Sequence, residues 1–427
     1  MNWLFDADER FTDVKKSSRL CVLCKGAHLL CGKSRCPIVV RANIMYEAVR
    51  YFDRLDITGS SPPGVFVGRF GYPKVYVGPL TPPFRGDTRI LDTPEYWFGM
   101  SIEDIVRFRS ILLRGEKPVH VYSASKPDEL LLTLQELAMS RKPVDLEVNL
   151  ARKPKTSLIL DDEVQPLGVS APISKVRVEG NIYVDRRMEK VYYDRDLKAT
   201  DAVFDLYRSG VPVSSIQKAF SLGVFGIGSN RRLVPTRWSI TAVDSIISER
   251  LLENVKRYPP ISTYLLFESV YLDNRFEILM IPSFWSYESI EAWYPKTIWN
   301  QDGKIPVIEG DWEGYHGRRS YAMIGGCYYA ARLAVLEYLE SIRRQASVLI
   351  LREIHPGYIM PVGVWHVREH VRNALRRRPL AFQGIEEVLS RISERLEVPL
   401  KTWIEHSHLL KRELYQQRIQ NYLSGSS

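Results

Sequence analysis

Alternating apolar and polar residues predict a β-hairpin early in the chain. The runs Val65-Phe-Val-Gly-Arg-Phe70 and Lys74-Val-Tyr-Val-Gly78 alternate with a period of two, and Gly71-Tyr72-Pro73 between them is typical of a turn. From Ile261 to Ile281, two antiparallel strands that turn at Asp273-Asn274 are expected. Further short strands are expected at Val144–Leu150, Ser157–Leu160, Val176–Val178, Ile182–Val184, Val191–Tyr193 and Val348–Leu351.

Helical periodicity and capping residues predict the helices. Ser101, in the pattern Ser-x-x-Asp, indicates a helix start, and Ser239 or Thr241 is expected to cap an amphipathic helix that ends at Arg257. The other expected helices are Ala42–Leu55, Pro127–Met139, Asp201–Arg208, Ile216–Leu222, Tyr321–Gln345, Trp365–Arg378 and a pair between Ile385 and Tyr415. The two short helices joined at Gly210 leave a helix-turn-helix open, although an ordinary helical hairpin is favoured.

These elements predict an α+β protein with four parts. The parts are an N-terminal zinc-binding module at 1–42, a mixed α/β body at 43–290, a mostly helical C-terminal domain at 291–412 and a flexible tail at 413–427. The segment Trp285–Gly317 is interpreted as an aromatic and acidic loop.

Composition indicates a soluble globular protein of 427 residues, with 45% hydrophobic and 26% charged residues. No apolar run has the length of a membrane span, and the acidic N-terminus does not resemble an export signal, so a cytoplasmic protein without a membrane partner is expected. The net charge of +9 favours anionic partners, because much of the excess is arginine, which binds phosphate with two hydrogen bonds.

Four of the five cysteines lie within one short segment, at Cys21, Cys24, Cys31 and Cys36. This spacing predicts a tetrahedral site for one structural Zn²⁺, and Gly26 follows closely behind the first pair, where the chain must turn. Disulfides, redox chemistry and an iron–sulfur cluster are the alternatives, and His28 is a weaker candidate ligand in place of one cysteine.

The residues around the cysteines add a prediction of DNA contact. No Asp or Glu occurs between Val14 and Tyr46, whereas seven lysines and arginines do. Such a compact, positively charged module suits a phosphate backbone, although the charges also offset the thiolates of a zinc site.

A segment rich in glycine and arginine, Gly223–Thr241, is the interior candidate for a phosphate site. Its glycines allow close backbone approach, and Arg231, Arg232, Arg237 and Ser239 are the candidate phosphate or nucleotide ligands. The segment is neither a P-loop nor a Rossmann fingerprint, and a loop that only packs is the alternative.

An acidic cluster provides a weaker alternative function. Asp311, Glu313 and His316, next to arginines, could hold a metal ion and cleave a phosphodiester, which would make the protein a nuclease or nucleotide hydrolase. No second acidic motif supports this, and Cys327 lies in an apolar helix where thiols are usually unreactive, so no catalytic activity is assigned.

The C-terminal residues fit a motif for docking on the sliding clamp PCNA. In Gln416-Gln-Arg-Ile419-Gln-Asn-Tyr422-Leu423, three apolar side chains would form a plug on one 3₁₀-like turn and Gln416 would fill a polar pocket. The alternative is that the preceding helix continues, so that Ile419 and Tyr422 simply pack.

The chain resembles the archaeal Nre family of DNA repair proteins, and within it the NreA type. The resemblance covers nearly the whole chain and is carried by the cysteine segment, Arg231–Thr241, Tyr321–Arg332, Gly357–Trp365 and the C-terminal motif. It implies an archaeal, cytoplasmic protein that acts in the DNA damage response and is recruited by PCNA. It implies no particular reaction.

Overall fold

The computed structural model describes residues 23–33, 35–154, 167–301 and 303–415. The chain divides into two compact units, and the N-terminal unit comprises Arg35–Arg250 and Met360–Glu369. The C-terminal unit comprises the rest of the chain, with Leu251–Ile359 as its longest segment. This division differs from the boundary expected near residue 290, because β11 (Ser347–Ile354) pairs with β8 (Asn274–Ile281) on one side and with β9 (Ser286–Trp293) on the other, so one sheet spans that position.

The N-terminal unit is built on a six-stranded sheet in the order β1-β5-β6-β4-β3-β2, in which only β4 and β6 are parallel neighbours. Its strands are β1 Asp56–Ser61, β2 Val65–Val67, β3 Lys74–Thr81, β4 Leu113–His120, β5 Val144–Leu150 and β6 Ser170–Val178. The predicted hairpin is confirmed, since β2 and β3 pair antiparallel and Gly71, with a φ of 79°, allows the turn.

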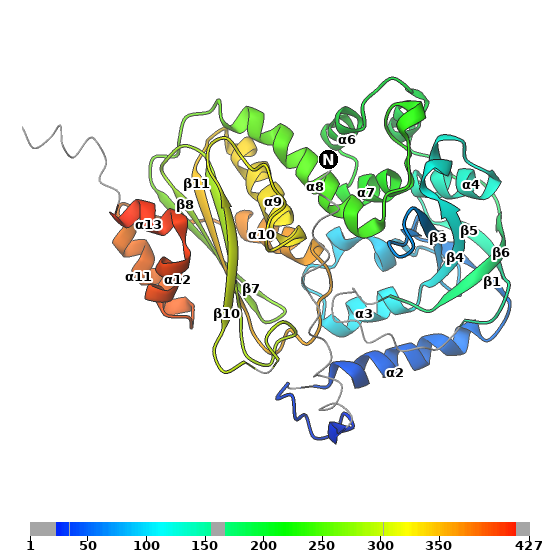
Figure 1. Ribbon diagram of the computed structural model, residues 1–427, viewed down its shortest axis with the longest axis horizontal. Helices are drawn as coiled ribbons and strands as arrows, with labels where there is room; N and C mark the ends of the chain where they lie inside the picture. The colour runs from blue at the N-terminus through cyan, green and yellow to red at the C-terminus, as the bar shows by residue number, and fades with distance from the viewer. Residues whose placement is uncertain (1–22, 34, 155–166, 302, 416–427) are drawn as a thin grey trace, which may run out of the picture. The chain divides into compact units, whose positions relative to one another are not determined.

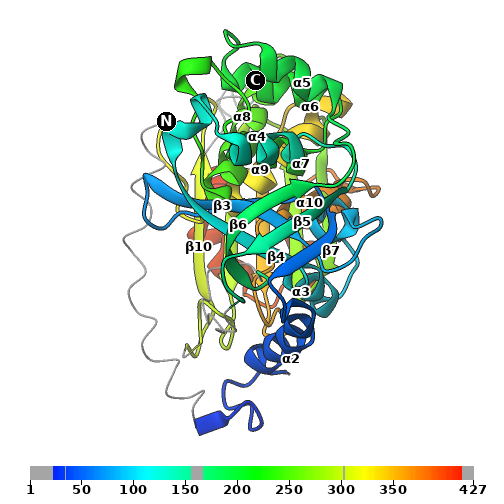
Figure 2. The same ribbon diagram turned by 90° about the vertical axis from the view of Figure 1, so that its right-hand side faces the viewer.

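Helices cover both faces of this sheet, with α4 and α7 on one side and α2 and α3 on the other (Figures 1 and 2). The α-helices are α2 Pro37–Val49, α3 Ile102–Ser110, α4 Glu129–Ala138, α5 Arg186–Tyr193, α6 Ala199–Arg208, α7 Val213–Ser221 and α8 Thr236–Val255. The 3₁₀ turns are η2 Arg50–Phe52, η3 Arg89–Asp92, η4 Pro94–Tyr96, η5 Val121–Ser125 and η6 Gly228–Asn230. As predicted, the Ser101 side chain caps α3 by accepting a hydrogen bond from the Asp104 N–H. Most positions of α7 are buried, in agreement with an ordinary helical hairpin.

Three sequence predictions in this unit are wrong. The strand expected at Ile182–Val184 is reduced to an isolated bridge between Val184 and Ser140. The strand expected at Val191–Tyr193 is part of α5, which begins because the Asp185 side chain accepts a hydrogen bond from the Arg187 N–H. Neither Ser239 nor Thr241 caps a helix, because α8 starts earlier, with the Ser239 N–H already bonded to the Pro235 carbonyl.

The C-terminal unit contains a second six-stranded sheet, in the order β10-β9-β11-β8-β7-β12, in which only β9 and β11 are parallel neighbours. Its elements are β7 Tyr264–Tyr271, β8 Asn274–Ile281, β9, β10 Val307–Glu313, α9 Gly326–Ile342, β11 Ser347–Ile354, α10 Trp365–Leu375, β12 Leu380–Phe382, α11 Ile385–Arg395, α12 Leu400–His406 and α13 His408–Tyr415. Helix α9 lies on one face of the sheet and α11–α13 lie on the other, where Leu279, Leu351 and Trp403 contribute to a common core (Figure 1). Helix α10 and helix α8 each contain residues of both units.

The prediction of a loop at Trp285–Gly317 is also wrong, since the strands β9 and β10 lie in this segment. Its acidic residues are tolerated in a buried sheet because they are bonded: Glu288 accepts hydrogen bonds from the Ser407 hydroxyl and from the N–H groups of His408 and Leu409. Among the described residues, no helix is both long and apolar enough to cross a membrane.

Candidate nucleic-acid interface

Three segments of the N-terminal unit contain no acidic residue, namely 57–86, 117–127 and 206–243, yet together they carry ten lysines and arginines. Backbone contacts join them at one end of the sheet. The Val121 N–H donates to the Pro73 carbonyl at 2.9 Å, and the Leu233 N–H donates to the Val121 carbonyl at 2.8 Å. The Val67 N–H donates to the Thr236 hydroxyl at 2.9 Å, which fixes the start of α8 beside the β2–β3 turn.

We call the surface formed by Arg69, Lys74, Arg232 and Arg237 the basic corner. Lys74, Arg232 and Arg237 are exposed, and Arg69 is half-buried. Lys74 and Arg232 have no ion-pair partner among the residues that the structure describes. The Arg232 guanidinium lies 5.3 Å from the centre of the Tyr122 ring. Lys74 and Arg232 therefore present positive charge that no ion pair among the described residues neutralises.

The predicted phosphate ligands separate into two groups. Arg231 is buried, and its guanidinium donates to the carbonyl oxygens of Gly226, at 2.8 Å, and Tyr192, at 2.7 Å. The Ser239 hydroxyl is also buried and donates to the Thr236 carbonyl at 2.9 Å. These two side chains hold the glycine-rich loop and the first turn of α8, whereas Arg232 and Arg237 reach the surface.

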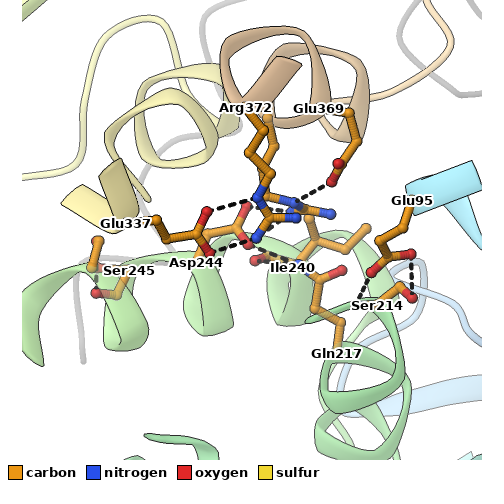
Figure 3. Close-up of polar contacts among 11 residues, drawn as sticks. Glu95, Ser214, Gln217, Ile240, Asp244, Ser245, Glu337, Glu369 and Arg372 are labelled. Carbon is orange, nitrogen blue, oxygen red and sulfur yellow. Dashed lines mark hydrogen bonds and ion pairs between the residues drawn. The ribbon is translucent and has the colours of Figure 1, made fainter. Parts of the chain in front are cut away.

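Buried polar contacts hold the first half of α8 in place (Figure 3). The Gln217 amide of α7 donates to the Ile240 carbonyl at 3.3 Å and to the Asp244 carboxylate at 2.9 Å. Arg368 of α10 donates to both oxygens of the Asp244 carboxylate, at 2.8 and 2.9 Å. Since Arg237 projects from the first turn of the same helix, these contacts determine where one charge of the basic corner lies.

The half-buried Glu95 makes a second polar contact in this region, because its carboxylate accepts hydrogen bonds from the N–H and the hydroxyl of Ser214, at 3.0 and 2.8 Å. Burial alone would raise the pKa of Glu95, but the charge of Arg368 and the hydrogen bonds from Ser214 lower it overall. Glu95 is therefore ionised at neutral pH, and the charge of Arg368 acts on both the buried Asp244 and the half-buried Glu95.

The cysteine segment is described only in part, because Cys21 lies outside the described residues. Cys24, Cys31 and Cys36 are free thiols. Backbone N–H groups of Leu30, Gly26, His28 and Leu29 face the Cys24 sulfur and lower the pKa of its thiol, and Gly26 reaches this arrangement with a φ of 73°. No cluster of three potential metal ligands occurs within the described ranges.

The two carboxylates of the acidic cluster, Asp311 and Glu313, already accept hydrogen bonds from other residues of this chain. The Asp311 carboxylate accepts hydrogen bonds from Arg318, at 2.7 Å, and from the Met323 N–H, at 2.8 Å. Although burial acts to raise the pKa of Asp311, these hydrogen bonds lower it overall. Glu313 is buried and accepts hydrogen bonds from Trp285, Tyr328 and Arg332. His316 is exposed and lies in ring contact with its neighbour Tyr315.

Cys327 lies in the first turn of α9, and burial raises the pKa of its thiol to about 12. The thiol is thus protonated at neutral pH, the form in which cysteine is a poor nucleophile. The four candidate clamp-docking residues, Gln416, Ile419, Tyr422 and Leu423, lie outside the described residues, which end at Tyr415 of α13.

Sequence reasoning missed the contribution of the β2–β3 turn and of η5 to this surface. The sequence indicates Arg69 and Lys74 only as parts of a hairpin, and no local motif marks Tyr122. The signal that could have found them is the absence of Asp and Glu from residues 57–86 and 117–127, which contain five lysines and arginines.

Comparisons with known proteins cover almost the whole chain. A family model described as Archaeal Nre, N-terminal matches residues 30–300, and one described as Archaeal Nre, C-terminal matches residues 313–422. DNA repair protein NreB of Archaeoglobus fulgidus is 42% identical over 92% of this chain and 97% of its own length. DNA repair protein NreA of the same organism is 41% identical over 88% of this chain and 94% of its own. DNA repair protein NreA of Haloferax volcanii is 35% identical over 80% of this chain and 83% of its own length. No solved structure matches this chain.

Proposed function

Because the chain belongs to the archaeal Nre family, with relatives named as DNA repair proteins, we propose that it is a repair factor that binds DNA and docks on the PCNA clamp. The observation that carries DNA binding is the basic corner. Lys74 and Arg232, which have no ion-pair partner among the described residues, lie there together with the exposed Arg237, so a phosphate backbone would meet positive charge.

Docking on PCNA is assigned to the C-terminal motif. Ile419, Tyr422 and Leu423 supply the three apolar side chains, and Gln416 supplies the polar one. The motif follows directly after α13, which ends at Tyr415. A short segment at the end of a folded unit is well suited to hold a ring-shaped partner while the folded part contacts DNA.

One structural Zn²⁺ is assigned to Cys21, Cys24, Cys31 and Cys36. The free thiols of the three described cysteines and the N–H groups that face the Cys24 sulfur fit this assignment, since zinc binds thiolates and backbone N–H groups stabilise them. The metal would tie down a segment rich in lysine and arginine.

We do not extend the proposal to catalysis by Asp311, Glu313 and His316. Both carboxylates already accept hydrogen bonds from arginine, and Glu313 is buried beneath aromatic side chains. A phosphodiesterase site of this kind needs carboxylates that open toward substrate and metal.

DNA binding by the basic corner is tested with the double variant Lys74→Glu and Arg232→Glu. Fluorescence anisotropy with labelled DNA at two salt concentrations should show at least about tenfold weaker binding and a smaller salt dependence. Lys175→Glu is the matched control, since Lys175 is an exposed lysine of β6 outside the corner. Unchanged affinity and salt dependence in the double variant would refute the assignment.

A further inference from the structure

Four large aromatic side chains are exposed at the basic corner. The exposed fraction is 72% for Phe70, 37% for Tyr72, 48% for Tyr76 and 55% for Tyr122. Aromatic rings gain more from burial than most side chains do, so a group of exposed rings on one surface indicates a binding function rather than chance.

These rings do not contribute to the core of the sheet. In β3, Val75 and Val77 are fully buried on one face, whereas Lys74 and Tyr76 project from the other. On β4, the residues opposite them are His120 and Pro118, which are also exposed. Strand alternation thus places a positive charge and an aromatic ring side by side on the outer face.

Two of the rings, those of Tyr122 and Phe70, already have contacts within the protein that favour their positions. His120 stacks on Tyr122 with 5.3 Å between ring centres, and the Arg232 guanidinium lies over the same tyrosine. At the β2–β3 turn, the Arg69 guanidinium lies 4.9 Å from the centre of the Phe70 ring. Preformed ring positions lower the entropic cost of binding.

We propose that the basic corner binds single-stranded DNA, with bases stacked on Phe70, Tyr76 and Tyr122 and with phosphates held by Lys74 and Arg232. This inference rests on the proposed DNA binding of the same corner and names the form of DNA. Bases of a duplex already cover each other's faces, so exposed rings add nothing to duplex binding, whereas unpaired bases stack on them regardless of sequence.

The experiment compares an oligothymidine of about 20 nucleotides with a blunt duplex of equal length, by fluorescence anisotropy. The wild-type protein should bind the single strand more tightly. The double variant Tyr76→Ala and Tyr122→Ala should bind the single strand at least about tenfold more weakly and bind the duplex within about twofold of the wild type. Its salt dependence should not change, because no phosphate-binding charge is removed.

Two matched variants separate stacking from folding. The double variant Tyr76→Phe and Tyr122→Phe keeps both rings and should bind the single strand like the wild type. Tyr183→Ala removes a tyrosine that lies outside the corner and is 53% exposed. Like Tyr122, this tyrosine has a cation near its ring, because the Lys142 ammonium lies 4.6 Å from the ring centre. This variant should retain full affinity.

The outcomes distinguish the two proposals. If the Tyr76 and Tyr122 alanine variant keeps its single-strand affinity, or loses duplex affinity equally, the stacking inference is overturned while the charge assignment stands. If the wild type binds neither DNA, the proposed function fails and the inference fails with it. Tighter binding of an oligouridine of equal length, also lost in the alanine variant, would overturn DNA as the ligand.

Discussion

The guanidinium of Arg368 donates hydrogen bonds to both oxygens of the Asp244 carboxylate, although both side chains are almost completely buried. The positive charge of Arg368 also helps to lower the pKa of Glu95. Arg368 is thus the cation that pairs with the buried Asp244 carboxylate and favours the charged form of the half-buried Glu95, next to the first half of α8, the helix that carries Arg237 of the basic corner.

Arg368→Ala should destabilise the protein by about 3–5 kcal/mol, because it leaves buried charge without a partner. Equilibrium urea unfolding measures this loss. Replacing Arg368 by Met together with Asp244 by Leu should cost less, since the pair is then removed as a whole. Arg208→Ala, an exposed arginine at the end of α6, is the control and should cost less than about 1 kcal/mol. A small effect of Arg368→Ala, equal to that of the control, would contradict the account.

Glu277 of β8 should make stability depend on pH. Its carboxyl is buried, which raises its pKa from 4.5 to about 7 despite the hydrogen bond from Arg395. Its second oxygen has no hydrogen-bond partner among the described residues. A pKa raised by folding stabilises the folded state most below pH 4.5, and this contribution is lost as pH rises to about 7.

Glu277→Gln should therefore become more stable relative to the wild type as pH rises from 4.5 to 7, by at most about 3 kcal/mol, and the difference should then level off. Thermal unfolding at a series of pH values provides the measurement. A difference between variant and wild type that stays constant over this range would show that Glu277 titrates normally.

The cysteine segment should hold about one zinc per chain, as measured by elemental analysis of the purified protein. Cys24→Ser should reduce the zinc content strongly, because it removes the thiol that the backbone N–H groups favour as thiolate. Cys327→Ala should leave the zinc content unchanged, since that thiol lies in α9. The site would be excluded if the purified protein carried no zinc and if the thiols of both variants titrated as free thiols.

The predictable parts of the fold are those with local signals. The hairpin follows from alternation around Val75 and Val77, and α3 follows from the cap at Ser101. By contrast, β9 was missed because the burial of Glu288 depends on donors from Ser407 and its neighbours, more than a hundred residues away in the chain. Hydrogen-bond partners that lie so far apart in the chain leave no local pattern in the sequence.

In the candidate site, the local sequence also fails to predict the roles of single residues. Arg231 and Arg232 are identical neighbours in the sequence, and both were candidate phosphate ligands. The fold buries Arg231 against backbone carbonyls and leaves Arg232 over the exposed ring of Tyr122. Only the path of the loop before α8 decides between the two roles.

The C-terminal motif should be necessary for clamp binding. Tyr422→Ala combined with Leu423→Ala removes two of the three apolar side chains and should abolish co-elution with PCNA in size-exclusion chromatography. Thermal stability should remain that of the wild type, because the changes lie beyond α13, the last helix described. Co-elution that persists in the double variant would disprove the assignment of the motif.

The most direct test of the central claim is whether one molecule joins the clamp to DNA. A labelled oligothymidine is mixed with PCNA and the protein, and co-migration of label and PCNA is measured by size-exclusion chromatography. The account predicts co-migration with the wild type and its loss in both the Tyr422/Leu423 variant and the Lys74/Arg232 variant, each for its own reason. Co-migration that survives both sets of substitutions would contradict it.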